Sequence, residues 1–420
     1  MSLTAPVSML SHPASAPLYT LEGLRNADPI LGLALLMIVA LVAGELVHRA
    51  SRLPRIVGQM LAGALASPLA LRLLDQTELD PWKPLIDLAV GVLVFELGSR
   101  IRPRWLLDNP WLSLSAACEA VFAGLIVSLV LHWMGMAPMS AVLAGVVAMS
   151  TSPVIAIAVV HEAQPRGQVT ERLLMLAALN SVLAVLALKA WRVAASAGAA
   201  TPGFDWQPAL ANAVYVLCGS FLLGAIVGLA LERLARIVRG SGSLAVLQIG
   251  MVVLAALLAT QWTLSPLLAL LIAGVVARGR MGHGLTVEPQ LGSAGAVLAV
   301  LLFLSMGLLS TLDDLLRVWP WVLAVLLARA AGKALGVFAV ARPSGLSWRQ
   351  AGALTLALQP MSNVALLLAA TTYGWPDDIP APDARLLQAL LIATTLMQLS
   401  GPWWTQFGLR DVARESGNKH

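Results

Sequence analysis

Long apolar runs leave this sequence little choice of fold. Thirteen of them follow one another, and the short segments between them hold most of the charged residues. A helix needs about 20 apolar residues to cross the hydrocarbon core of a bilayer, and these runs are roughly 18–25 residues long. We therefore expect transmembrane helices at residues 30–47, 55–73, 84–100, 111–133, 138–160, 172–193, 209–231, 242–262, 264–279, 293–310, 318–341, 350–373 and 385–407.

The composition supports this interpretation. Hydrophobic residues make up 58% of the chain, charged residues only 12%, and the mean hydropathy is +0.81. Soluble globular domains carry about 25% charged residues. The longest loops are only about 10–15 residues, too short for a separate soluble domain. We predict an all-α polytopic membrane protein of about 13 transmembrane helices, surrounded by lipid bilayer.

Arginines at the ends of the apolar runs predict the orientation of the chain. They follow the odd-numbered runs, at Arg49, Arg52, Arg55, Arg100, Arg102, Arg104, Arg166, Arg172, Arg233, Arg236, Arg239, Arg278, Arg280, Arg342 and Arg349. By the positive-inside rule these loops and the C-terminal tail are cytoplasmic, and the N-terminus lies outside. We expect a multi-pass protein of a bacterial-type inner (plasma) membrane. The net charge of +5 is explained by these topology signals, so we expect no nucleic-acid partner.

Two apolar runs are interrupted by proline among polar residues. The fifth contains Ser150-Thr151-Ser152-Pro153, and the twelfth contains Gln359-Pro360-Met361-Ser362-Asn363. These runs enter the membrane in opposite directions. Interrupted helices at corresponding positions of two halves point to inverted repeats with a binding site near the bilayer midplane. We therefore predict two crossed discontinuous helices, although proline kinks with a purely structural role are also common in membrane helices.

Four ionisable residues lie well inside the apolar runs: Glu96, Glu119, Arg329 and Lys333. Each costs about 2.5–3.5 kcal/mol to insert, which makes it a candidate functional residue. Arg329 and Lys333 are four residues apart and share a helix face. Glu119 and Lys333 lie at similar depths in corresponding runs, so Glu119 is placed to pair with Lys333 or with Arg329.

Several segments, in this order and spacing, resemble the monovalent cation:proton antiporter superfamily. They are Gly58-Gln59-Met60-Leu61-Ala62-Gly63, Val94-Phe95-Glu96-Leu97-Gly98, Thr151-Ser152-Pro153, Asn180-Ser181, Phe303-Leu304-Ser305-Met306-Gly307 and Lys333. The resemblance covers nearly the whole chain. It implies a homodimer in which a transport core moves against a scaffold like an elevator.

The resemblance divides the chain as follows: an N-terminal tail at 1–27, scaffold and dimerisation helices at 28–104, core helices at 105–200, a linker helix at 201–240, scaffold helices at 241–315, core helices at 316–408 and a C-terminal tail at 409–420. It implies that the ion is bound by residues of the third, fifth and sixth runs, to which we add those of the second interruption. These residues are Glu96, Thr151, Ser152, Asn180, Ser181, Gln359, Ser362 and Asn363. In the family, a basic residue at the place of Lys333 pairs or competes with a carboxylate of the sixth run.

The chain departs from the family pattern at two central positions. Ser152 and Ser181 stand where the family typically has aspartates, and a serine hydroxyl does not titrate near neutral pH. Glu96 is the remaining carboxylate that matches a family motif, unless neighbouring arginines hold it at the cytoplasmic interface. Lys333 then pairs with Glu119, carries the proton itself, or combines with Arg329 to favour an anion.

We predict a secondary transporter that exchanges a small ion for protons, with monovalent cation:proton antiport as the first hypothesis. The alternatives are an anion or organic-acid transporter on the same scaffold, or a homologue that does not transport. Neither Gly-x-Ser-x-Gly nor His-Glu-x-x-His occurs in the chain, so we expect no enzyme. Cys118 and Cys218 lie in apolar runs, which favours inert thiols, and we predict no cofactor or metal.

Overall fold

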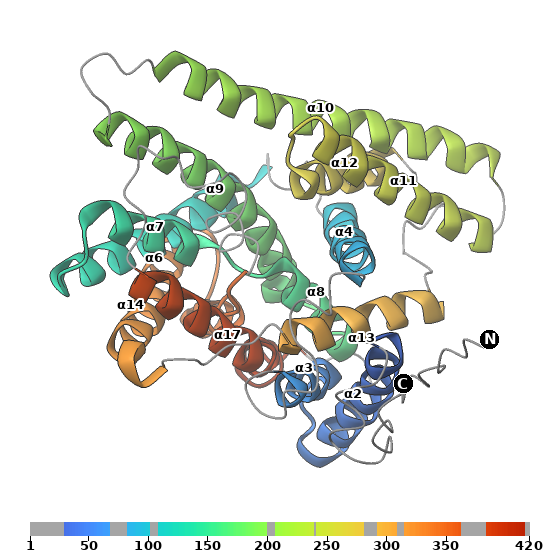
Figure 1. Ribbon diagram of the computed structural model, residues 1–420, viewed down its shortest axis with the longest axis horizontal. Coiled ribbons are helices and arrows are strands. Elements are labelled where there is room, and N and C mark those ends of the chain that lie inside the picture. Colours follow the sequence, from blue (N-terminus) through green and yellow to red (C-terminus); the bar gives the residue numbers. More distant parts are fainter. Residues whose placement is uncertain are drawn as a thin grey trace, which may run out of the picture.

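A computed structural model gives the arrangement of the helices (Figure 1). It describes residues 29–67, 82–100, 108–199, 206–238, 241–280, 292–308, 315–362 and 384–415. Within those ranges all regular structure is helical. The prediction of an all-α protein is confirmed.

The helices follow the expected apolar runs closely. They are α2 (Pro29–Ser51), α3 (Arg55–Ala66), α4 (Lys83–Arg100), α6 (Pro110–Trp133), α7 (Pro138–Met149), α8 (Pro153–Ala163), α9 (Gln168–Ala199), α10 (Trp206–Ile237), α11 (Ser241–Gln261), α12 (Pro266–Arg280), α13 (Gly292–Leu308), α14 (Leu315–Ala341), α15 (Trp348–Ala357) and α17 (Ala384–Phe407), with a π-helical turn η2 (Gly408–Val412) after α17. Among the described residues, seven candidate spans are long and apolar enough to cross a membrane, α7 and α8 counting together as one, and three further apolar helices are shorter. The chain is therefore a polytopic membrane protein.

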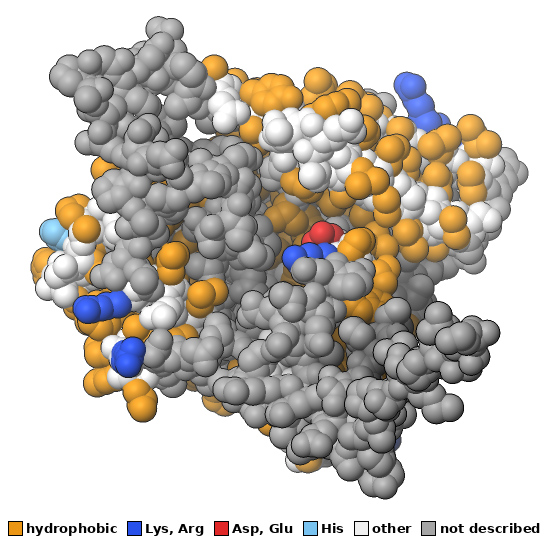
Figure 2. All heavy atoms as spheres, in the orientation of Figure 1, with side chains coloured by type: hydrophobic (Ala, Val, Ile, Leu, Met, Phe, Trp, Pro, Cys, Tyr) orange, Lys and Arg blue, Asp and Glu red, His pale blue; other side chains and the backbone are white. Residues whose placement is uncertain are grey.

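Large hydrophobic side chains cover much of the described surface. Among the described residues on the face seen in Figure 2, hydrophobic side chains predominate and charged ones are few. On α2, Ile38 is 61% exposed, and on α10, Leu222 is 61% exposed. Such surfaces are unfavourable in water but are expected where helices face lipid.

Close helix crossings occur at glycines in equivalent places of the two expected repeats. A β-carbon on Gly63 of α3 would lie closer than 3.0 Å to the Leu304 carbonyl oxygen of α13, and one on Gly98 of α4 would lie equally close to that of Leu271 of α12. Both crossings are therefore backbone-to-backbone contacts that tolerate no side chain. They join the second run to the tenth and the third run to the ninth, as an inverted repeat predicts.

The extended segments of the two interruptions meet, and the place where they meet is the crossing region. The helix α7 ends at Met149 and α8 begins at Pro153, while α15 ends at Ala357. The backbone N–H of Ser152 donates to the Pro360 carbonyl oxygen at 2.8 Å, so the extended segments are in direct contact. The part of the twelfth run beyond residue 362 lies outside the described residues.

Candidate functional site

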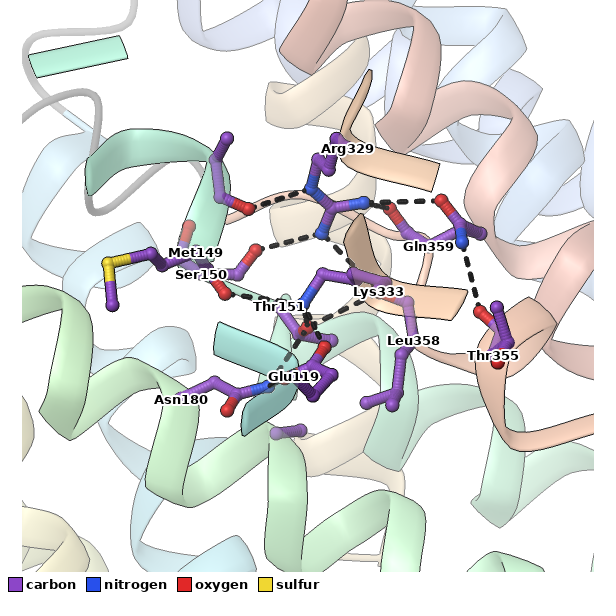
Figure 3. A network of polar contacts seen from close by, with 12 residues as sticks. Glu119, Met149, Ser150, Thr151, Asn180, Arg329, Lys333, Thr355, Leu358 and Gln359 are labelled. Atoms are coloured by element: carbon purple, nitrogen blue, oxygen red, sulfur yellow. Dashed lines mark hydrogen bonds and ion pairs between the residues drawn. The ribbon is translucent and has the colours of Figure 1, made fainter. Parts of the chain in front are cut away.

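A buried ion pair lies at the centre of the crossing region (Figure 3). Lys333 of α14 is paired with Glu119 of α6, and neither side chain is exposed. The Lys333 ammonium also donates to the Thr151 hydroxyl at 2.9 Å and to the Met149 carbonyl oxygen at 3.2 Å. The predicted contact between Glu119 and Lys333 is thus present, and it joins both helices to the first interruption.

Two glycines bring α14 and α6 close enough for this pair. A β-carbon on Gly336 would lie closer than 3.0 Å to the Glu119 α-carbon, and one on Gly332 would lie 2.6 Å from the Ala123 α-carbon. Real β-carbon contacts are not that short. The spacing of the two helices at Lys333 therefore depends on the absence of these side chains.

Asn180 of α9 completes the contacts of the carboxylate. Its amide Nδ2 donates to Glu119 Oε2 at 2.6 Å and lies 3.5 Å from the Thr151 hydroxyl. Its Oδ1 is buried and has no hydrogen-bond partner among the described residues. A buried acceptor without a donor is costly, so this oxygen is available for a ligand or a water molecule.

Arg329 lies one turn before Lys333 and binds backbone. Its five hydrogen bonds go to the carbonyl oxygens of Ala148, Ser150, Leu358 and Gln359 and to the side-chain Oε1 of Gln359, at 2.6–3.4 Å. These carbonyls belong to the C-terminal ends of α7 and α15, where the helix dipole favours a cation. Arg329 therefore joins the two interrupted helices.

The two serines at the positions where the resemblance implies aspartates have local partners. Ser152 is the N-cap of α8 and accepts from the Ile155 N–H at 3.4 Å. The Ser181 hydroxyl donates to the Ala177 carbonyl oxygen of its own helix at 2.9 Å. Both bonds stabilise helix backbone, and neither involves Glu119.

The second interruption contributes Gln359 and Ser362. The side-chain Nε2 of Gln359 donates to the Thr355 carbonyl oxygen at 3.0 Å, and its Oε1 faces Arg329. Ser362 is buried. Asn363 lies outside the described residues.

Glu96 belongs to a different group of contacts. The carboxylate of this buried side chain of α4 is in contact with the imidazole Nε2 of His161 on α8. His161 and its neighbour Glu162 were not among the predicted site residues, because no sequence motif links them to the helices that they contact. The interpretation that Glu96 faces the transported ion stays a prediction.

The chain matches known proteins over most of its length. A family model described as "Sodium/hydrogen exchanger, transmembrane" matches residues 34–407. Among solved structures, the sodium proton antiporter MjNhaP1 from Methanocaldococcus jannaschii at pH 8 is similar with a TM-score of 0.64 and 16% identity, covering 91% of this chain and 98% of that one. An electron-microscopy structure of the same antiporter gives a TM-score of 0.64 and 17% identity, over 93% and 99% of the two chains. The structures support the same fold, and the family match shows that this chain belongs to the sodium/hydrogen exchanger family.

Proposed function

We propose that this protein exchanges a monovalent cation for a proton across the membrane, and that the cation competes with the protonated Lys333 for the carboxylate of Glu119. The observation that carries the proposal is the contact set of the Lys333 ammonium. It touches oxygens of Glu119, Thr151 and Met149. Carboxylate, hydroxyl and carbonyl oxygens are also the ligands that a hard metal cation prefers.

The ammonium therefore occupies the place that a transported cation would take. In this scheme Lys333 loses a proton, its side chain withdraws, and the cation binds the same oxygens. The Oδ1 of Asn180, which has no partner among the described residues, supplies one further acceptor beside Glu119. Lysine suits this role because a buried ammonium gives up its proton more readily than a guanidinium does.

The charges around the site favour a strict exchange. Glu119 balances Lys333, while Arg329 faces two helix C-termini that each carry about half a negative elementary charge. A cation that entered without release of a proton would leave an uncompensated buried charge, which is strongly unfavourable. We therefore expect one proton to leave for each cation that binds.

We further propose that the exchange proceeds by movement of the core, residues 105–200 and 316–408, against the scaffold, in a homodimer. Glu119, Thr151, Asn180 and Lys333 all lie within the core ranges. A site contained in one moving unit can be carried across the membrane intact. The cytoplasmic placement of the C-terminal tail rests on the arginine pattern and belongs to the same proposal.

The contacts favour this function over anion transport. Arg329 has five N–H groups, and its five hydrogen bonds leave none for an anion. The charge of Lys333 is compensated by Glu119. An anion would therefore find neither a free donor nor a net positive site.

The test uses the purified protein in proteoliposomes that contain a pH-sensitive dye. Addition of sodium, potassium or lithium should move protons in the wild type, and Glu119→Gln should abolish the response because an amide cannot ionise. The matched control is Glu171→Gln, the same change at an exposed position in the first turn of α9, which should keep the response. A wild type that responds to none of the three cations, or a Glu119→Gln variant with normal exchange, would overturn the proposal.

A second measurement separates binding from proton release. In weakly buffered detergent solution, cation addition should acidify the wild-type sample. Lys333→Gln should bind the cation without releasing a proton, so calorimetric heat would persist while acidification disappears. Acidification of unchanged size in Lys333→Gln would show that another group carries the proton.

A further inference from the structure

Arg172, in the second turn of α9, is a buried cation that the proposed exchange does not use. The residue is 1% exposed. Its Nη2 group donates to the Ser344 carbonyl oxygen in the turn after α14, whereas Nε and Nη1 are buried and have no hydrogen-bond partner among the described residues. No ion pair joins this guanidinium to a described carboxylate. A buried charge without a counter-ion is strongly unfavourable, so Arg172 indicates that an anion binds nearby.

A role in membrane topology does not explain the burial of Arg172. An arginine that marks a cytoplasmic loop keeps its charged end in water. Arg166, six residues earlier, is exposed in this way. Arg172 has exchanged water for a single carbonyl oxygen, which is the environment of a binding residue whose ligand is missing.

The N-terminus of α9, about one turn before Arg172, holds an anion that the chain itself supplies. One carboxylate oxygen of Glu415 accepts the Val169 N–H at 2.7 Å, and the other accepts the Thr170 N–H at 2.9 Å and the Thr170 hydroxyl at 2.7 Å. Unpaired N–H groups and the helix dipole favour an anion at this end of a helix. The contacts of Glu415 therefore show which class of group the N-terminus of α9 accepts.

Gly167 lets the carboxylate approach the backbone of α9. A β-carbon on Gly167 would lie closer than 3.0 Å to both Cδ and Oε1 of Glu415, and real β-carbon contacts are not that short. Gly167 is exposed, and its backbone is not in the left-handed region. An alanine at this position would therefore fill the place of the anion without changing any charge.

Arg172 is placed to add donors to the same site. Side chains of a helix lean toward its N-terminus, so that of Arg172 lies over the first turn of α9. Glu415 binds the backbone and Thr170 and leaves Nε and Nη1 of Arg172 unused. A phosphate group has more oxygens and binds a guanidinium through two parallel hydrogen bonds. It can hold the N–H groups of α9 and Arg172 at once, which this carboxylate does not do.

Displacement of Glu415 requires only a local change in the C-terminal segment. Leu409 belongs to the apolar cluster that includes Val169, and Val412 packs against that cluster. The Val412 carbonyl oxygen also accepts the Nε group of Arg349 at 2.6 Å. These contacts hold the segment without Glu415, so the carboxylate can leave the N-terminus of α9 while the segment stays in place.

We propose that Arg172, the N–H groups of Val169 and Thr170, and the Thr170 hydroxyl bind a phosphate-type oxyanion that displaces the carboxylate of Glu415. The site is separate from the Glu119–Lys333 pair, and its existence does not depend on cation exchange. The arginine pattern places it at the cytoplasmic end of α9, where free phosphate and the headgroups of anionic lipids both offer this chemistry.

The test is isothermal titration calorimetry of the full-length protein with inorganic phosphate in a neutral detergent. Arg172→Gln should weaken binding by about tenfold or more, because it removes charge-assisted hydrogen bonds. Glu415→Gln should tighten binding by about two- to fivefold, because an amide competes less well than a carboxylate for a helix N-terminus. The matched control is Arg278→Gln at the exposed end of α12, which should bind phosphate like the wild type.

Gly167→Ala decides the question even if Arg172→Gln does not fold. Its methyl group occupies the place of the anion and leaves every charge unchanged, so phosphate binding should disappear. The control is Gly279→Ala in α12, where a β-carbon meets no atom within 4 Å and binding should persist. Phosphate heat of wild-type size in Gly167→Ala, or in folded Arg172→Gln, would overturn the site.

A second arm of the experiment identifies the source of the oxyanion. In nanodiscs, replacement of part of the phosphatidylcholine by phosphatidylglycerol should raise the unfolding temperature of the wild type more than that of Gly167→Ala if a lipid headgroup binds. Calorimetric heat without this difference assigns the site to a free anion, and the difference without heat assigns it to a lipid. If wild type and Glu415→Gln show neither heat nor a lipid effect, Glu415 is only a cap of α9 and the proposal is wrong.

Discussion

Two buried cations on α14 differ in what they bind. Arg329 and Lys333 are one helical turn apart, and neither is exposed. All the partners of Arg329 are neutral oxygens, four of them backbone carbonyls, whereas Lys333 is paired with the ionisable Glu119. A group among fixed neutral acceptors has no reason to change its charge. A group that shares a site with a carboxylate can exchange its proton for another cation.

The residue types suit these two roles. A guanidinium presents five donors in a rigid plane, which matches carbonyls that diverge from two helix ends. An ammonium is compact and can be replaced by a metal ion of the same charge. We infer that Arg329 holds the crossing together and that Lys333 takes part in exchange, so substitutions one turn apart should damage different properties.

The largest expected effect is the loss of Arg329. In Arg329→Met, the carbonyls of Ala148, Ser150, Leu358 and Gln359 lose their donor, and unpaired buried polar groups cost about 1–3 kcal/mol each. We expect little folded protein, measured as a lost monodisperse peak and a lowered unfolding temperature in detergent. Arg329→Lys should rescue only part of the stability, because one ammonium cannot reach all these oxygens.

The control for this comparison is Arg278→Met, which removes an exposed arginine at the end of α12. Its stability should stay within about 0.5 kcal/mol of the wild type. If Arg329→Met unfolds at the wild-type temperature, the inferred structural role is wrong.

An intermediate effect is expected at Gly336. In Gly336→Ala the new methyl group would meet the Glu119 backbone, so α6 and α14 must separate. Overpacking of this kind costs typically about 1–3 kcal/mol. Because the separation also lengthens the Glu119–Lys333 contact, the pH midpoint of exchange should shift, which simple destabilisation would not produce.

Gly250 is the control for the substitution at Gly336. It lies in α11, and a β-carbon there meets no atom within 4 Å. Gly250→Ala should leave the pH midpoint unchanged and the stability equal or slightly higher, since alanine favours helix by up to about 1 kcal/mol. A normal midpoint in Gly336→Ala would mean that the helix spacing does not tune the ion pair.

The sequence predicted which segments form this centre better than it predicted how their side chains are oriented. The contact between the two interruptions was expected from two prolines in oppositely directed runs, and the Glu119–Lys333 contact was expected from depth. Both depend on position along the membrane normal, which hydropathy reports. Which face of a helix a residue occupies depends on how the helix is rotated, and motif matching does not report it. Asn180 therefore reaches Glu119, while Ser181, about 100° further round the helix, bonds to its own backbone.

Contacts between helices distant in sequence were the least predictable part. His161 and Glu162 end an apolar helix, where polar residues are ordinary, and nothing local indicates that they meet Glu96 and the start of α3. The full set of partners of Arg329 was equally hidden, because most are backbone carbonyls. Backbone acceptors leave no signature in side-chain composition.

The smallest expected effect is at Ser181, and it tests whether the ion binds at Ser181, as the resemblance implies, or at Glu119, as we propose. The Ser181 hydroxyl bonds only to Ala177 in its own helix among the described residues, so Ser181→Ala should change stability by less than about 0.5 kcal/mol. Exchange rates in proteoliposomes should stay within about twofold. Asn180→Ala, its neighbour, removes a donor to Glu119 and should slow exchange much more. If Ser181→Ala abolished exchange while Asn180→Ala did not, the ion would bind on the face of α9 that the family pattern indicates, and Glu119 would be only a structural partner of Lys333.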